Sequence, residues 1–380
     1  MRIGVNALSV VPGVTGGGET YLTGLLRALA ELDMGHRYTL FLSSRHQEAL
    51  GGIPPEFDCI VCEFARSRVR RVAFERFHLP RLVEKAGVDI LFSPGNVAAP
   101  VQTCAQVVCV QSLLYRLAPR EVSLARRMYF AWAMPRSVRC ADMVIAVSED
   151  ARRQVLALGG VSEEKVRVVH EGVDSSFHPL PPQDIERGLA RWGLMPGYIL
   201  FVSGLKPYKN ADKLIRACAA NSGECAPKES LVIAGPDRTG LTPSLRGLAE
   251  KLGIAERVKF LGVIEREWLP ALYAGASVFA FPSAIETFGL PVLEAMGCGT
   301  PVVASNRFAV PEVVGGAGLI ADPDDVPAFS KAIRRAQTDE ALRNTLRRKG
   351  LERASLFTWR RAAEETLPVL EEAHRRWKGR

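Results

Sequence analysis

Residues 277–301 read SVFAFPSAIETFGLPVLEAMGCGTP, and this stretch is the most informative part of the chain. The apolar run Ser277–Phe281 is typical of a buried strand. A Phe-Gly-Leu-Pro loop follows, and Pro291 suits the first turn of a helix, because the missing N–H group of proline costs nothing there. The stretch therefore predicts a strand, a loop and a helix start. Glu286 lies in the loop, and Glu294 lies about one turn into the helix.

The predicted helix start and the two glutamates together suit one kind of ligand. Unpaired N–H groups and the positive dipole end at a helix N-terminus favour a phosphate group. Glu286 and Glu294 can both face the crevice beyond the carboxyl end of the strand. Because carboxylates accept hydrogen bonds from sugar hydroxyls, a phosphate site flanked by carboxylates indicates a sugar nucleotide. The alternative is that Glu286 is a solvated loop residue and that Glu294 only complements the helix dipole.

This stretch resembles the E-x7-E signature of the retaining glycosyltransferases of family 4, which have the GT-B fold. Glu286 and Glu294 match the two glutamates, with Phe288-Gly289-Leu290-Pro291 and Glu294-Ala295-Met296 in their usual places. Two glutamates at this spacing alone are a weak signal, but the loop and the Gly-Thr-Pro-Val-Val-Ala-Ser segment after it make the match specific. The resemblance covers nearly the whole chain. It implies an α/β fold with two Rossmann-like domains whose parallel sheets face a central cleft.

Short β-branched runs alternate with longer helical stretches along the whole chain, which predicts an α/β fold with parallel sheets. We expect a first domain over 1–176, a proline-rich linker over 177–196 and a second domain over 197–357. A last helix over 358–380 follows, and in the family such a helix crosses back onto the first domain. The resemblance makes the first domain the acceptor-binding one and the second the nucleotide-sugar-binding one.

The same alternation predicts individual elements. In the first half we expect helices at Glu19–Leu32, Val69–Ala86, Val122–Arg139 and Glu149–Leu158, and strands at Arg2–Ala7, Arg37–Leu42, Asp58–Glu63, Ile90–Ser93, Gln106–Val110, Met143–Val147 and Val166–His170. In the second half we expect strands at Tyr198–Val202, Leu231–Ala234, Val258–Gly262, Val278–Phe281 and Pro301–Ala304.

The composition of the 380 residues, with 47% hydrophobic and 24% charged residues, is that of a globular protein. Met1–Leu8 predicts a short strand and not a signal peptide, and no apolar run approaches the length of a membrane helix. We expect a cytoplasmic protein, with a peripheral position at the inner membrane face as a further hypothesis.

The eight cysteines are scattered along the sequence. Cys59 and Cys62 point to opposite faces of a predicted strand, so we expect buried free thiols.

Two further segments contribute to the expected donor site. Gly16, Gly17 and Gly18 link the first strand to the first helix, and without Cβ atoms their backbone can approach a ligand closely. In the family this loop approaches the diphosphate of the donor or the acceptor. Lys209 matches the family's lysine in the turn that opens the second domain, and Lys206 is the candidate for a second cation.

The resemblance implies a role for each of these groups. Lys209, the amides of Phe288–Leu290 and the loop Gly16–Gly18 would stabilise the negative charge that develops on the diphosphate. Glu286 would hold the transferred sugar and shield its developing positive charge. Glu294 would hold the ribose hydroxyls.

The acceptor side is expected at Gln111 and Ser148 in the first domain. Many relatives have His-Asp where this chain has Gln111-Ser112. Histidine could shuttle a proton, but glutamine cannot, so we expect Gln111 to position the acceptor by hydrogen bonding. Ser148 either caps the next helix or contacts the acceptor.

One D-x-D pattern, Asp322-Pro323-Asp324, has the form of a metal site for a diphosphate. It precedes a predicted helix, so helix capping is its expected role. We therefore expect no required metal and no cofactor, with the nucleotide sugar acting as a substrate.

The 49 lysines and arginines exceed the 41 acidic residues, and arginines crowd two stretches, Arg66–Arg81 and Arg116–Arg139. Phe74, Phe77 and Leu79 interleave with the first cluster, as an amphipathic face would. No nucleic-acid-binding motif accompanies the arginines, so nucleic acid is not an expected partner. We expect instead an anionic membrane surface that presents a lipid-linked saccharide. The alternative is a solvated arginine-rich face.

These features predict a retaining hexosyltransferase. Its donor would be GDP-mannose or a UDP-sugar such as UDP-glucose or UDP-N-acetylglucosamine, and its acceptor a glycan or a lipid-linked saccharide. The alternatives are a phosphorylase or epimerase-like enzyme of the same fold and a non-catalytic basic binding protein. The intact glutamate pair and Lys209 argue against the binding protein, and we identify no pyridoxal-linked lysine region that would mark a phosphorylase.

Overall fold

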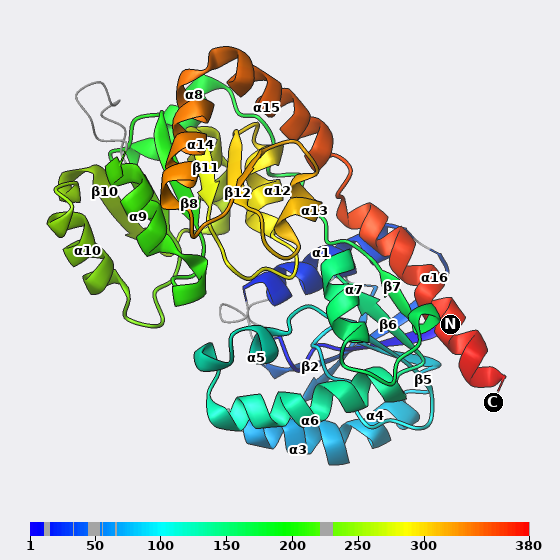
Figure 1. Cartoon of the computed structure of the whole chain (residues 1–380). Helices are drawn as coiled ribbons and strands as arrows, with labels where there is room; N and C mark the ends of the chain where they lie inside the picture. Colours follow the sequence, from blue (N-terminus) through cyan, green and yellow to red (C-terminus); the bar gives the residue numbers. More distant parts are fainter. Residues whose placement is uncertain are drawn as a thin grey trace. The chain divides into compact units, whose positions relative to one another are not determined.

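The chain folds into two compact units, each with a parallel sheet and covering helices (Figure 1). Unit 1 comprises Met1–Gly172 and Thr358–Arg380, and unit 2 comprises Val173–Phe357. The computed structural model describes residues 1–10, 16–32, 34–44, 54, 56–64, 67–220 and 231–379.

Within the described residues, unit 1 contains a seven-stranded sheet whose neighbouring strands are all parallel. Parallel strands buried on both faces read as continuous apolar runs, and every residue of β5 is buried. The order across the sheet is β3 (Asp58–Cys62), β2 (Arg37–Ser43), β1 (Arg2–Asn6), β4 (Ile90–Ser93), β5 (Ala105–Val110), β6 (Met143–Ala146) and β7 (Val166–Val168). Its helices include α1 (Gly17–Glu31), α3 (Arg68–Phe77), α4 (Leu79–Lys85), α5 (Leu114–Leu117), α6 (Leu124–Cys140), α7 (Glu149–Leu156) and α16 (Trp359–Lys378).

The C-terminal helix α16 belongs to unit 1, where it packs on α1, β5 and β6 (Figure 1). Trp359, its first residue, lies directly over Gly24 of α1, where a Cβ atom would come within 2.2 Å of the indole ring. The indole also meets the ring of Tyr21 edge-on, with 5.9 Å between the centroids. Because Gly24 has no side chain, α1 leaves room for Trp359 at the start of α16.

Unit 2 contains a six-stranded parallel sheet among the residues that the structure describes. The order is β10 (Val258–Gly262), β9 (Leu231–Ala234), β8 (Tyr198–Val202), β11 (Ala276–Phe281), β12 (Val302–Ser305) and β13 (Leu319–Ala321). Its helices include α8 (Pro182–Ala190), α9 (Ala211–Ala220), α10 (Thr242–Lys251), α11 (Leu269–Ala274), α12 (Leu290–Gly297), α13 (Val310–Val314), α14 (Val326–Thr338) and α15 (Glu340–Ala354). In neither unit does a helix of the described ranges have both the length and the hydropathy needed to span a membrane.

The segment 177–196, expected to be a linker, is instead folded into unit 2. It forms α8, which packs on α11; Leu189 is fully buried, and a Cβ atom on Gly188 would lie 2.5 Å from the Cβ of Ala271. The prolines of this segment predicted a linker. Pro182, however, occupies the first turn of a helix, where proline is well tolerated.

Two further sequence predictions need correction. The expected helix over 69–86 is two helices, α3 and α4, which meet at His78, because Pro80 cannot continue a helix and instead stands in the first turn of α4. The short edge strand β13 was not predicted, since its three residues carry too little periodic signal. The twelve predicted strands are all present, with ends that differ by no more than two residues.

Candidate active site

The strand order of unit 2 places two loops next to each other at the carboxyl edge of its sheet. From β8 the chain continues to β9 and β10 on one side, whereas β11, β12 and β13 lie on the other side. Ligands of open parallel sheets bind where the strand order reverses in this way. The loops after β8 and β11 flank the reversal, and they carry Lys209 and Glu286.

One side-chain and one backbone hydrogen bond hold these two loops together. The short turn Pro207–Lys209 ends at Asn210, which adopts the left-handed conformation with φ 56° that asparagine tolerates better than most residues. From there its side-chain amide donates to the carbonyl of Pro282 at 2.8 Å. Ala284 N donates in turn to the carbonyl of Tyr208, also at 2.8 Å. The lysine turn and the glutamate loop are therefore joined directly to each other.

Lys209 and Glu286 form an ion pair between the two loops. Both side chains are 14% exposed, so each is largely withdrawn from water but still reachable by a ligand. The ammonium also lies 5.2 Å from the ring centroid of Tyr208 and 5.6 Å from that of Phe281, where the ring faces attract a cation. Both charged groups are thus held in place without help from a ligand.

Helix α12 begins beside Glu286 and offers its backbone to a ligand. Gly289 precedes it with φ 124° and ψ 48°, a conformation that glycine adopts far more easily than other residues. Phe288 and Leu290 are 3% and 8% exposed, and the Phe288 ring packs edge-on against Phe357. The amides of this segment can therefore contact a phosphate, whereas the two apolar side chains serve the core.

Glu294 is buried in α12, and the hydroxyl of Tyr273 donates to its Oε2 atom at 2.8 Å. Burial raises the pKa of Glu294, while the bond from Tyr273 and the nearby Arg266 oppose the shift. Arg266 lies 3.6 Å from Asp174, whose charge acts on Glu294 in the raising direction. Sequence reasoning singled out Glu294 but missed Tyr273, because no motif links α11 to α12.

Lys206 opens the lysine turn, and its carbonyl accepts the amide of Lys209 at 2.9 Å. Its side chain is half-buried and makes no ion pair with a described residue. Lys206 is therefore placed in the same turn as Lys209 but is not fixed by a partner as Lys209 is.

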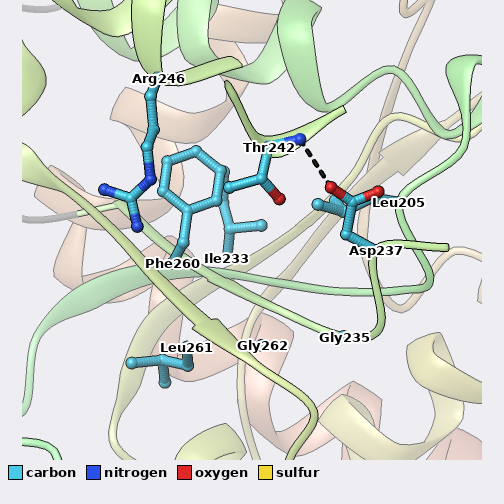
Figure 2. A pocket seen from close by; sticks show the side chains of 9 residues that line it. All are labelled: Leu205, Ile233, Gly235, Asp237, Thr242, Arg246, Phe260, Leu261 and Gly262. Carbon is cyan, nitrogen blue, oxygen red and sulfur yellow. Dashed lines mark hydrogen bonds between the residues drawn. The ribbon is translucent and has the colours of Figure 1, made fainter. Parts of the chain in front are cut away.

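A pocket with a cavity volume of about 300 Å³ opens at the carboxyl ends of β9 and β10 (Figure 2). It reaches the lysine turn through Leu205, whose amide donates to the carbonyl of Pro236 at 2.9 Å. The guanidinium of Arg246 lies over the ring of Phe260, 4.8 Å from its centroid. The lining residues are Leu205, Ile233, Gly235, Asp237, Thr242, Arg246, Phe260, Leu261 and Gly262.

Gly235 and Asp237 shape the wall of this pocket. Gly235 has φ 133°, and a Cβ atom there would lie 2.0 Å from the carbonyl oxygen of Ser203, so no other residue fits. Asp237 accepts the amides of Thr239, Leu241 and Thr242 at 3.1, 3.0 and 2.7 Å (Figure 2 shows the Thr242 bond). A hydrogen bond from the side chain of Thr242, followed by these amide bonds, holds the pKa of Asp237 well below its usual range, so its charge anchors the start of α10.

The glycine loop of unit 1 stands at the start of α1. Gly16 has φ 53° and caps the helix, and its carbonyl accepts the amide of Glu19 at 2.9 Å. No atom of the described residues lies within 4 Å of the positions where Cβ atoms would stand on Gly16 and Gly17, and both are exposed. Gly18 follows inside the first turn of α1. The backbone here is open to a ligand.

The two residues expected on the acceptor side differ in position. Gln111 follows β5, and its backbone amide donates to Oδ1 of Asn96 at 2.7 Å. The side chain of Gln111 is half-buried. Ser148 is fully buried, and its Oγ accepts the amide of Ala151 at 3.0 Å. Ser148 is therefore the N-cap of α7, which is one of the two roles expected for it, and a contact with an acceptor stays a prediction.

Family models match both units. The model described as "Glycosyltransferase Family 4" matches residues 15–177, and the one described as "Glycosyl transferases group 1" matches residues 184–353, which include Lys209, Glu286 and Glu294. The chain belongs to the family 4 glycosyltransferases. The resemblance recognised in the glutamate loop is thus confirmed.

Curated members of this family resemble the chain over part of its length. An O-antigen chain mannosyltransferase B of Escherichia coli is 33% identical over 243 residues, which cover 64% of this chain and 64% of that protein. A D-inositol 3-phosphate glycosyltransferase of a Nocardioides species is 34% identical over 252 residues, which cover 62% of this chain and 55% of that protein. The chain therefore matches less than two thirds of the length of these relatives.

Solved structures resemble the whole chain. HepE from Anabaena, in complex with UDP-glucose, gives a TM-score of 0.78 at 21% identity and covers 98% of this chain and 99% of its own. Sucrose-phosphate synthase from Thermosynechococcus elongatus gives 0.78 at 22% identity, with 98% of each chain covered. The predicted GT-B fold, with two Rossmann-like domains and parallel sheets, is confirmed.

The D-x-D pattern of this glycosyltransferase has a different role from the one expected. Asp324 pairs with Lys213 and Arg307, and Asp322 lies 2.9 Å from Arg307. The cap of α14 is the next residue, Asp325, whose Oδ1 accepts the amide of Ala328 at 2.9 Å. In the described part of the chain, no group of three or more His, Cys, Asp or Glu side chains is arranged to hold a metal. Independence from metal stays a prediction.

Glu294→Gln should make the folded protein more stable at neutral pH. Burial raises the pKa of Glu294 in the folded state, so ionisation of this residue lowers stability as the pH rises through that pKa. Below about pH 4.3, the ordinary value for glutamate, the residue is protonated in both states and the difference should vanish. Melting temperatures of both proteins across this pH range measure the effect. Glu250→Gln, at an exposed position, is the control, and a pH-independent gain at position 294 would contradict the prediction.

Proposed function

We propose that this glycosyltransferase moves a hexose from a nucleoside-diphosphate sugar to a saccharide or lipid-linked saccharide, with retention of the anomeric configuration. The donor is GDP-mannose or a UDP-sugar. The mannosyltransferase of Escherichia coli among the relatives makes GDP-mannose the first donor to test.

The observation that carries this proposal is the Lys209–Glu286 pair beside the start of α12. In the transfer, the bond between the anomeric carbon and the diphosphate oxygen breaks, and the acceptor oxygen bonds to the same carbon. The acceptor proton passes to the departing diphosphate. Lys209 and the amides of Phe288–Leu290 offset the negative charge that grows on the diphosphate. Glu286 faces the positive charge that grows on the sugar.

The nucleoside part of the donor has two supports on the same sheet edge. The pocket between Leu205 and Gly262 offers apolar surface next to the lysine turn. Glu294 supplies a carboxylate for ribose hydroxyls, and the Tyr273 hydroxyl fixes its orientation. On unit 1, the open backbone of Gly16–Gly18 and the side chain of Gln111 are the groups that we assign to the diphosphate and the acceptor.

Purified protein incubated with GDP-mannose, UDP-glucose or UDP-N-acetylglucosamine tests the proposal. We expect slow release of the nucleoside diphosphate from one donor, and faster release when a saccharide acceptor is added. Proton NMR of the product then gives the anomeric configuration. Inversion would overturn the retaining mechanism. Formation of a sugar phosphate with inorganic phosphate would favour a phosphorylase, and inertness towards every donor would favour a binding protein.

The transfer should survive removal of divalent metal ions. Asp322 and Asp324 are neutralised by Arg307 and Lys213 and so have no spare charge for a cation. Lys209 supplies the positive charge that a metal supplies to the diphosphate elsewhere. We expect initial rates with and without EDTA to agree within twofold. Loss of activity in EDTA that manganese restores would contradict this prediction.

A further inference from the structure

Helix α6 of unit 1 carries a row of large apolar side chains on its outer face. Leu124, Met128 and Trp132 are 70%, 64% and 57% exposed. Spaced four residues apart, they lie one above the other along a single face of the helix. The inner face is already occupied by buried residues such as Met134 and Val138. The exposed row therefore has no role in the packing of unit 1.

Arginines are abundant on α6 and on its neighbour α3. Helix α6 holds four of them and no acidic residue, and all four are exposed: Arg126, Arg127, Arg136 and Arg139. Helix α3 adds Arg68, Arg70, Arg71 and Arg76, with Glu75 as its single acid. The two helices thus carry eight arginines against one glutamate. Seven of these arginines are exposed, whereas Arg71 is half-buried and its charge acts on Glu75. No ion pair with a described residue neutralises Arg127 or Arg136.

Helices α3 and α6 are neighbours on unit 1 (Figure 1). Burial raises the pKa of Tyr129 on α6, and Glu75 and Arg71 of α3 also act on this hydroxyl, which requires that the helices lie close together. Helix α3 contributes two exposed apolar residues of its own, Val69 at 78% and Phe77 at 63%. We call the surface formed by Val69, Phe77, Leu124, Met128 and Trp132 with the arginines of both helices the α3/α6 face.

The amphipathic face expected from the sequence is partly wrong. Leu79 is fully buried, and Phe74 packs on the core of unit 1, so neither can contact a membrane. Of that set only Phe77 is exposed, and Arg66 lies outside the described residues. Of the ten large hydrophobic residues exposed in the described ranges, five lie on α3 and α6. The apolar surface is concentrated here, but its main row is on the second helix.

We infer that the α3/α6 face docks on an anionic lipid bilayer, with the Leu124–Met128–Trp132 row inserted among the headgroups. An apolar row flanked by arginines matches the chemistry of that interface, and tryptophan is enriched there. A second copy of the chain is a poor occupant, because a symmetric contact would set the exposed arginines of one copy against those of the other. The α3/α6 face contains none of the residues assigned to the candidate active site, so the inference can hold or fail independently of the proposed function.

Vesicle co-sedimentation of the full chain tests the inference without an activity measurement. One set of vesicles is phosphatidylcholine alone, and the other contains phosphatidylglycerol as well. We expect binding to the anionic vesicles that weakens as salt is added, because the arginines are exposed and therefore screened. Equal binding to both vesicles, or no binding at low salt, would overturn the inference.

Two pairs of variants separate charge from insertion. Arg127→Gln with Arg136→Gln should weaken binding to anionic vesicles about thirtyfold, since each basic residue near the surface contributes about fivefold. Exposed Arg334 and Arg335 of α14, changed to Gln together, are the control for charge.

The second pair of variants tests insertion. Met128→Ser with Trp132→Ser should weaken binding about tenfold or more. Met195→Ser with Val263→Ser, exposed on unit 2, is its control. Equal losses in variants and controls would overturn the inference.

Fluorescence locates the contact. Vesicles should shift tryptophan emission to the blue in the native chain, and Trp132→Phe should remove most of that shift while it preserves binding. A shift that survives Trp132→Phe would place the lipid contact elsewhere and overturn the inference. Light scattering without lipid tests the alternative that the face binds a second copy of the chain. Self-association that Met128→Ser with Trp132→Ser abolishes would assign the face to that second copy and overturn the inference.

Discussion

Lys209→Met should lower turnover about a hundredfold or more, because it removes the cation that offsets charge on the departing diphosphate. In the structure this ammonium is held by Glu286 and lies near the rings of Tyr208 and Phe281. Glu286→Gln should lower turnover at least tenfold and leave affinity for the free nucleotide nearly unchanged, because its contact strengthens only as the glycosidic bond breaks. Steady-state rates with a saturating donor measure both effects.

The two changes should not add, since each one leaves its partner unpaired. The double variant Lys209→Met with Glu286→Gln should therefore lose less activity than the product of the single losses. Lys213→Met is the control, because Lys213 also pairs with a carboxylate, that of Asp324, but at the more exposed start of α14. Native turnover in Lys209→Met would exclude its catalytic role. Losses that multiply would show that the pair does not act as a unit.

Glu294→Ala should weaken binding of the nucleoside diphosphate and of the donor alike, by about 1.5–3 kcal/mol. The carboxylate is a charged hydrogen-bond acceptor, and its removal also leaves the buried Tyr273 hydroxyl without its partner. Tyr273→Phe should have a smaller effect, because it keeps the carboxylate and loses only the group that orients it. Titration calorimetry with GDP and UDP measures these affinities.

Glu250→Ala on α10, an exposed glutamate, is the control for that experiment and should bind nucleotide normally. Thermal melting must accompany the titrations, because Glu294 is buried and its loss also affects packing. A folded Glu294→Ala protein with native affinity for both nucleotides would refute the ribose assignment.

Local patterns were sufficient for much of the fold. The strands could be predicted because parallel strands are buried on both faces and therefore read as short apolar runs. The start of α12 could be predicted because Gly289 and Pro291 each have a backbone preference that depends on their own covalent structure. Proline was a poor guide where it opens a helix, as at Pro182, since the same residue also marks loops.

The sequence predicted which residues belong to the candidate site, but it did not predict which of them contact one another. Glu286, Glu294 and Lys209 were identified from their motifs, whereas the ion pair between residues 77 positions apart was not. The partner of Glu294 was also missed. For Ser148 the sequence left a helix cap and an acceptor contact open, and the structure shows the cap, because a sequence shows which side chain can cap a helix but not what covers it.

By itself, the sequence determined the fold class, the strand positions and the identity of the charged residues around the glutamate loop, because these depend on residues close together in the chain. The tertiary structure alone decided that Lys209 meets Glu286, that Tyr273 binds Glu294 and that Leu124, Met128 and Trp132 face outward. Each of these depends on strand order and on which helix covers which face. Such choices are made by packing between distant segments, so no local pattern records them.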